Sequence, residues 1–244
     1  MIALHRAKER HHIRRRKQEV WLTFCPQDRM DPLADGFGAL EALDENRLPP
    51  GAGVAPHPRQ EAEIVTYVLK GALAQEDSTG RSGVIQAGEF QRMTAGRRVR
   101  HSERNASQAD WAHVFRMSLH PSESELDCTH EQKFFSVAER RGVLCIVASP
   151  DGRKGSLRVH QDALIYSTIL DVGQHLVHEL PQGRIAWLHV VRGEATLGDL
   201  VLTTGDGVGV TGEPAVSFTA QEETETLLLD LNHQPKSPKN GGAP

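Results

Sequence analysis

Two short stretches of the chain carry side chains that could bind a metal. The first, VAPHPRQ (residues 54–60), contains His57 and, two residues later, Arg59. The second, RHSE (residues 100–103), places Glu103 two residues after His101. Residues two apart on an extended strand point to the same face, so each pair can share one face of a sheet. Two histidines and one glutamate could form a facial triad of the kind that non-haem iron uses with oxygen.

Arg59 argues against tight metal binding at this place. A guanidinium has no lone pair to donate. One unit charge about 5 Å from a divalent ion costs about 6–7 kcal/mol at an effective dielectric of about 20. That is a large fraction of the roughly 10–16 kcal/mol of strong protein zinc sites. We therefore expect Arg59 to pair with Glu103 and to take the metal's place. The alternative is one divalent transition metal (Fe, or Zn, Cu or Ni) held by His57, His101 and Glu103, with Glu103 as the catalytic group.

Strand-like segments position these residues, and they indicate an all-β fold. Glycine (22) and proline (13) are frequent, which is typical of many short strands joined by turns. A short helix or turn is expected within residues 122–140. The expected strands are 20–25, 63–70, 72–76, 90–94, 111–119, 142–148, 156–160, 163–169, 184–192, 194–202, 214–219 and 224–231.

An internal repeat predicts two similar β-domains. Residues 67–96 and 189–212 share the order strand, basic residue, glycine, strand, turn and strand. Closing each group of strands into a barrel or sandwich would remove exposed sheet edges. We place the first domain, with the candidate site, at residues 1–140 and the second at 141–233. The Pro/Gly-rich tail, 234–244, is expected to be disordered.

The sequence resembles the pirin family, and within it the bacterial branch similar to quercetin 2,3-dioxygenase. The resemblance runs from about residue 2 to residue 231. It rests on HP-x4-EIVTYVL, DS-x-G, AGEFQRMTAG, RHSE and SPDGRKGSLRVHQD. It implies two cupin β-barrels in tandem, a bicupin, in which only the N-terminal barrel carries a metal. The family's ligand positions fall on His57, Arg59, His101 and Glu103.

The chain departs from the family pattern at several of these positions. Arg59 stands where the family has a second histidine, and Arg97 and Arg98 replace small residues. Arg116 aligns with a usual glutamine. We therefore predict a degenerate site, meaning one that has lost tight metal binding and has become a basic pocket. In the second domain the aligned positions are Glu179, Pro181, Phe218 and Ala220, which form no ligand set.

Three functions remain open from the sequence. The first is a bicupin that binds a small acidic or polar ligand in its basic pocket. The second is an active metal-dependent dioxygenase of the quercetinase type. The third is a protein-interaction module, since some pirins are regarded as transcriptional co-regulators. We expect a small-molecule ligand or a protein partner for a monomeric chain.

Composition narrows the class of protein and its expected partners. The 244 residues are 38% hydrophobic and 25% charged, with a net charge of −4, so neither a membrane span nor nucleic-acid binding is expected. We interpret Cys25, Cys128 and Cys145 as reduced thiols of a cytoplasmic protein and not as a zinc knuckle. His113 is expected to be a hydrogen-bonded core residue. The pairs His11–His12 and His175/His178 are expected on the surface.

Overall fold

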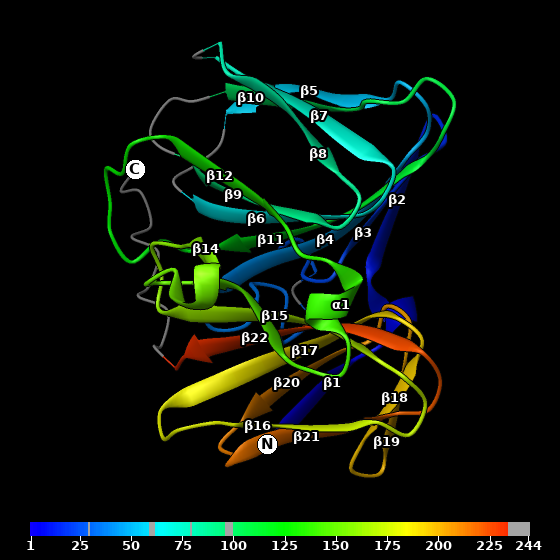
Figure 1. Ribbon diagram of the computed structural model, residues 1–244, viewed down its shortest axis with the longest axis vertical. Coiled ribbons are helices and arrows are strands. Elements are labelled where there is room, and N and C mark those ends of the chain that lie inside the picture. The colour runs from blue at the N-terminus through cyan, green and yellow to red at the C-terminus, as the bar shows by residue number, and fades with distance from the viewer. Residues whose placement is uncertain (29, 59–61, 79, 96–99, 234–244) are drawn as a thin grey trace.

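The computed structural model describes residues 1–28, 30–58, 62–78, 80–95 and 100–233, with residues 54–58 described through their backbone alone. Nearly all of the regular structure is β, in four sheets stacked as layers (Figure 1). Two seven-stranded sheets lie in the middle, and one four-stranded sheet lies outside each of them. Each pair of a large and a small sheet is called a barrel below.

The first barrel contains the sequence segments with the candidate site. Its large sheet has the strand order β12-β9-β6-β11-β4-β3-β2 and its small sheet the order β5-β10-β7-β8. The large sheet comprises β2 (His11–Arg15), β3 (Gln18–Leu22), β4 (Leu40–Leu48), β6 (Ala62–Lys70), β9 (Glu89–Ala95), β11 (Ala112–Leu119) and β12 (Thr129–Phe134). The small sheet comprises β5 (Gly53–Pro58), β7 (Ala72–Asp77), β8 (Ser82–Gln86) and β10 (Arg100–Asn105).

The second barrel repeats this arrangement. Its large sheet has the order β1-β20-β17-β22-β15-β13-β14 and its small sheet the order β16-β21-β18-β19. The large sheet comprises β1 (Ile2–His5), β13 (Cys145–Ser149), β14 (Leu157–Arg158), β15 (Ala163–Leu170), β17 (Arg184–Arg192), β20 (Gly207–Thr211) and β22 (Thr224–Asn232). The small sheet comprises β16 (His175–Glu179), β18 (Glu194–Leu197), β19 (Leu200–Thr203) and β21 (Ala215–Ala220).

The strands that form best from local sequence are also the most buried. The run EIVTYVL in β6 is rich in β-branched and aromatic residues and is buried over six consecutive positions. Both faces of this strand are covered, because one faces the small sheet and the other faces the second barrel. A single apolar core of side chains from both large sheets, including Phe115 and Trp187, joins the two barrels.

One outer strand crosses from the N-terminal chain segment to the second barrel. Strand β1 pairs with β20 of the second barrel, and β12 pairs with β9 of the first. Residues 2–5 therefore lie in the second barrel, although we assigned them to the domain of residues 1–140. The edge strand β1 of the second large sheet thus comes from outside the chain segment of that sheet's other strands, whereas the edge strand β12 follows β11 within the segment of the first large sheet. The proposed boundary at residue 140 otherwise remains a prediction.

A short polar segment connects the barrels. Residues 122–140, where a short helix was expected, hold both strand β12 and the one-turn helix α1 (Val137–Arg140). Ser136 caps α1 by accepting a hydrogen bond from the backbone N–H of Glu139. The remaining short helices are the 3₁₀ turns Ala7–Glu9 and Arg153–Gly155. In the described residues no helix is long and apolar enough to cross a membrane. The predicted disordered tail lies outside the described residues.

A buried polar contact also joins the two large sheets. Tyr67 in β6 donates its hydroxyl proton to Glu225 Oε1 in β22 at 2.5 Å. Arg140 of α1 donates to the same oxygen at 2.7 Å. Burial and the neighbouring carboxylate raise the pKa of Tyr67, so the hydroxyl stays a donor at neutral pH. This contact ties α1 to both barrels.

Candidate functional site

Strand β10 brings His101 and Glu103 together inside the first barrel. Its residues alternate between exposed and buried, with Arg100 and Arg104 pointing outward and His101 and Glu103 pointing inward. The two inward side chains are 3% and 7% exposed, and His101 Nε2 lies 3.6 Å from Glu103 Oε1. The predicted same-face arrangement of this pair is confirmed.

The other half of the predicted site lies largely outside the described side chains. In the backbone, His57 of β5 is registered opposite His101 of β10. This register is compatible with the predicted convergence, but the distance between the two rings stays a prediction. Arg59, Arg97 and Arg98 lie outside the described residues, and so does the expected Arg59–Glu103 pair.

Among the described residues, the cation that pairs with Glu103 is Arg116. The guanidinium of Arg116 donates from Nη2 to Glu103 Oε2, and both side chains are about nine-tenths buried. Arg116 comes from β11 in the large sheet and Glu103 from β10 in the small sheet, so the ion pair crosses the barrel interior. A charge-assisted hydrogen bond to a buried carboxylate is strong, and removing one partner leaves the other charge buried without compensation.

The described donors do not fit a tightly bound metal ion. Glu103, one of the predicted ligands, already accepts a hydrogen bond from a guanidinium. A cation placed against that carboxylate would also lie close to the positive charge of Arg116, which repels it. Among the predicted ligands whose side chains are described, His101 is the one imidazole, and one imidazole is fewer than transition-metal sites use.

A cavity of about 330 Å³ opens beside His101. Its lining includes Gln91, Arg81, His130 and Asp77. Asp77, at the end of β7, is the register partner of His101 on the side away from His57. The cavity therefore combines hydrogen-bond donors and acceptors with one exposed arginine, which suits a small polar molecule.

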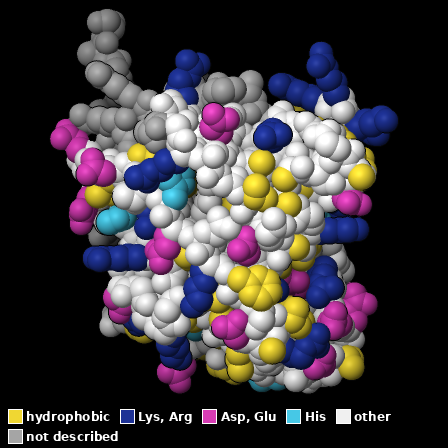
Figure 2. All heavy atoms as spheres, turned by 45° about the horizontal axis from the view of Figure 1, so that its top comes forward, with side chains coloured by type: hydrophobic (Ala, Val, Ile, Leu, Met, Phe, Trp, Pro, Cys, Tyr) yellow, Lys and Arg dark blue, Asp and Glu magenta, His cyan; other side chains and the backbone are white. Residues whose placement is uncertain are grey.

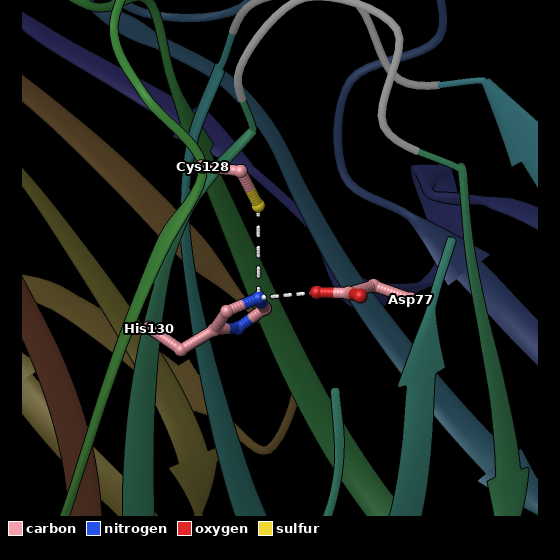
Figure 3. A group of neighbouring side chains, drawn as sticks. All are labelled: Asp77, Cys128 and His130. Carbon is pink, nitrogen blue, oxygen red and sulfur yellow. Dashed lines mark hydrogen bonds and ion pairs between the residues drawn. The ribbon is translucent and has the colours of Figure 1, made fainter. Parts of the chain in front are cut away.

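Sequence reasoning missed a second group of potential ligands at this cavity. His130 Nε2 lies 3.1 Å from Asp77 Oδ2 and 3.7 Å from Cys128 Sγ, and both groups point at the same imidazole nitrogen (Figure 3). Burial lowers the pKa of His130, which keeps this imidazole neutral at neutral pH. The available signal was Cys128-x-His130, a spacing of two on an extended segment, but nothing in the sequence pointed to Asp77 as its neighbour.

Three other histidines differ in their surroundings. His113 Nε2 lies 2.8 Å from Glu45 Oε1, so the predicted hydrogen-bonded histidine is confirmed. Although burial alone would raise the pKa of Glu45, its hydrogen bond with His113 and the nearby Arg10 lower it to about 2. His178, expected on the surface, is instead largely buried and lies 2.8 Å from Asp230 Oδ2. His175 is exposed, as predicted.

Strand register corrects the predicted counterparts of the site in the second barrel. The repeat aligns Leu73 with Ala195, each two residues after a glycine. Leu73 pairs with Asn105 in β10, and Ala195 pairs with Ala220 in β21, so Asn105 corresponds to Ala220. The sequence-based assignment of Phe218 and Ala220 to His101 and Glu103 is therefore wrong by two residues. The correct pairs are His101–Val216 and Glu103–Phe218.

The same comparison gives counterparts for the large-sheet side of the site. Arg116, Thr66 and Gln91 are register neighbours across β11, β6 and β9. Leu228, Leu188 and Val208 occupy the corresponding row across β22, β17 and β20. His178 is registered opposite Val216, as His57 is opposite His101, so His178 and not Glu179 is the counterpart of His57. The conclusion that the second barrel has no ligand set still holds for the described residues.

Comparison with known proteins agrees with this architecture. The family described as Pirin matches residues 5–118, and the quercetinase C-terminal cupin domain matches residues 146–231. The chain belongs to the pirin family. It is thus a tandem bicupin, as predicted.

Relatives from Escherichia coli cover nearly the whole chain. A curated protein of strain K12 named quercetin 2,3-dioxygenase is 36% identical over 95% of this chain and 99% of its own length. The crystal structure of YhhW superposes with a TM-score of 0.90 at 35% identity, covering 97% of this chain and 100% of that one. The complex of bacterial pirin YhhW with nickel(II) gives 0.89 at 36% identity, covering 95% and 99%.

Proposed function

We propose that this pirin-family bicupin uses its first barrel to bind a small acidic or polar molecule, and that the metal site of this barrel is degenerate. The observation that carries the proposal is the buried pair of Glu103 and Arg116. This pair compensates the carboxylate charge without a metal. The sequence adds Arg59 at a position where the family motif has a ligand histidine.

The surroundings of the site support an anionic or polar ligand. The cavity beside His101 offers the amide of Gln91 and the guanidinium of Arg81. Arg100, on the exposed side of the small sheet, adds a further cation. Basic side chains also project from the upper part of the face that Figure 2 turns toward the viewer. Such a field attracts small anions and raises their local concentration.

Metal content tests the degenerate site. The measurement compares the wild-type site, Arg59→His and Arg59→Ala, each in a Cys128→Ser background so that no thiolate from the neighbouring group contributes. After incubation with nickel or iron and gel filtration, we expect well under one equivalent in the wild-type site. Arg59→His gains an imidazole and loses a cation, and should bind most tightly. Arg59→Ala should bind only weakly. Stoichiometric metal in the wild-type site would overturn the proposal.

Ligand binding is tested with citrate and inorganic phosphate as probes. Binding to the folded state raises the free energy of unfolding by RT ln(1 + [L]/Kd), so the thermal midpoint should rise with probe concentration. The rise should shrink in Arg59→Ala and persist in Arg104→Ala, a matched arginine that points outward from β10. An equal rise in both variants would mean that the anions act on the general surface, and the pocket assignment would be wrong.

A second candidate function is metal-dependent oxygenation of a flavonol. The supporting observation is that His101 and Glu103 lie side by side in a chain that is 36% identical to a protein named quercetin 2,3-dioxygenase. The nickel complex of YhhW favours it as well. Oxygen uptake with quercetin, measured after loading with nickel or iron, separates the two functions. Turnover by wild type that His101→Ala abolishes would favour the dioxygenase.

A further inference from the structure

Asp77, Cys128 and His130 form a compact group with three different donor atoms. One ligand atom from each residue lies within 4.8 Å of the other two. His130 Nε2 is central, since it contacts both Asp77 Oδ2 and Cys128 Sγ (Figure 3). In the part of the chain that the structure describes, this is the group of histidine, cysteine and acidic side chains close enough to share one ion.

The separations match those around a tetrahedral ion. Zinc bonds of about 2.0–2.1 Å to nitrogen or oxygen and about 2.3 Å to sulfur place neighbouring ligand atoms roughly 3.3–3.8 Å apart. The two contacts to His130 Nε2, at 3.1 and 3.7 Å, need only small side-chain shifts to reach these values. Thiolate, imidazole and carboxylate are all ligands that zinc accepts.

The three residues are held by different parts of the first barrel. Asp77 ends β7, and its Oδ1 accepts a hydrogen bond from the backbone N–H of Arg81 at 3.2 Å. His130 lies in β12, opposite Met93 of β9. Cys128 precedes β12 by one residue, so an ion here would join the edge strand of the large sheet to the small sheet. That position is distinct from the His101–Glu103 pair, although His101 borders the same cavity as Asp77 and His130.

We propose that Asp77, Cys128 and His130 form a second metal site, which binds Zn²⁺ or a similar divalent transition-metal ion. A thiolate and a carboxylate together neutralise the two positive charges of such an ion. The three protein ligands leave one position of a tetrahedron open, and the cavity on which Asp77 and His130 border can supply a water there. This site does not rest on the proposed function, because it uses none of the residues assigned to the degenerate site.

One feature sets the expected strength of the site. His130 Nδ1 is buried and has no hydrogen-bond partner among the described residues. Ligand histidines usually donate this second N–H to an acceptor that orients the ring, and losing such a partner typically costs about 10–100-fold in affinity. We therefore expect weaker binding than in structural zinc sites with four protein ligands.

Cobalt(II) substitution tests the site through its sulfur ligand. Folded protein, kept reduced with a phosphine, is titrated with CoCl₂ alone. Thiolate ligation gives an intense charge-transfer band in the near ultraviolet, and we expect it to saturate at about one equivalent. Cys128→Ser should abolish the band, whereas Asp77→Asn and His130→Ala should weaken binding at least about tenfold. Cys145→Ser, which alters another partly buried free thiol, should keep the band.

A second readout covers variants that fold poorly. ZnCl₂ should slow the alkylation of Cys128 by iodoacetamide in wild type, with Cys145 as the internal control, as measured by peptide mass spectrometry. Absence of both the cobalt band and zinc protection in folded wild type would overturn the proposal, as would a band that persists in Cys128→Ser. The degenerate site contains no sulfur ligand, so it cannot produce the cobalt–thiolate band. The proposal of a degenerate site is tested by nickel or iron content, and either outcome of that test leaves the cobalt band unchanged.

Discussion

At the centre of the first barrel a row of polar side chains crosses three strands, whereas the corresponding row of the second barrel is apolar. When the facing residues of the small sheets are included, four polar residues of the first barrel have apolar counterparts in the second barrel. All four counterparts belong to one continuous apolar cluster. The replaced pairs are His101–Val216, Glu103–Phe218, Arg116–Leu228 and Gln91–Val208.

This difference shows in how each barrel is packed. The second barrel is filled by a single cluster of buried apolar side chains. In the first barrel the apolar residues divide into two smaller clusters, one around Leu73 and Ile85 and one around Ile64 and Met93. The Glu103–Arg116 pair lies at the polar level between them. The same framework can therefore be stabilised by packing alone, and the polar interior of the first barrel costs stability that a binding function can justify.

The largest expected effect comes from removing one half of the buried ion pair. Arg116→Ala leaves Glu103 buried without its cation, so the free energy of unfolding should fall by about 3–5 kcal/mol. Urea denaturation followed by fluorescence measures this change. Arg104→Ala on the exposed face of β10 is the control and should stay within about 0.5 kcal/mol of wild type. A loss below about 1 kcal/mol for Arg116→Ala would show that the carboxylate finds other compensation.

A smaller effect is expected from pH through His189, the counterpart of Tyr67. Its ring is fully buried, and neither ring nitrogen has a hydrogen-bond partner among the described residues. Burial lowers the pKa of His189 from 6.5 to about 3. Between these values the unfolded chain binds a proton that the folded chain does not, so stability is present above pH 6.5 and is lost as pH falls.

The magnitude follows from the slope of about 1.4 kcal/mol per pH unit for one proton. Between pH 6.5 and 5 the His189 contribution should fall by about 2 kcal/mol. This window lies above the range in which Glu45, with its pKa of about 2, gains its proton. Unfolding of wild type and of His189→Leu, compared at both pH values, isolates the contribution. Parallel pH curves for the two proteins would contradict it.

Much of the fold could be predicted from the sequence where local preference and burial agree. The run EIVTYVL was expected as a strand over residues 63–70 and forms β6. Strand β4, with the sequence LEALDENRL, was missed because Asp, Asn and Glu are rare in strands. Its polar side chains are tolerated because Glu45 finds Arg10 and His113 as partners. Such partners come from distant segments and leave no local signal.

The candidate site was predictable in its residue types but less so in its pairing. Same-face spacing placed His101 and Glu103 together correctly. The pair of Glu103 with Arg116, which faces it across the barrel, was not predicted. The predicted pair of Glu103 with Arg59 lies outside the described residues and stays a prediction. The spacing of residues along one strand does not predict which residue of the opposite sheet contacts them. The two-residue error in the second barrel has the same origin, since register is fixed by strand pairing.

The smallest change is expected when both charges of the pair are removed together. Glu103→Leu combined with Arg116→Met gives the first barrel the apolar character that Phe218 and Leu228 give the second. Replacing a buried ion pair by apolar residues of similar volume is often neutral or stabilising. The double variant should therefore lie within about 1.5 kcal/mol of wild type in urea denaturation, and well above Arg116→Ala. If the double variant were as unstable as Arg116→Ala, the charges would not be the cause. The loss of stability would then come from the shape of the new side chains. A Glu103→Gln, Arg116→Met variant, which keeps the volume of residue 103, can isolate this effect in the same urea denaturation.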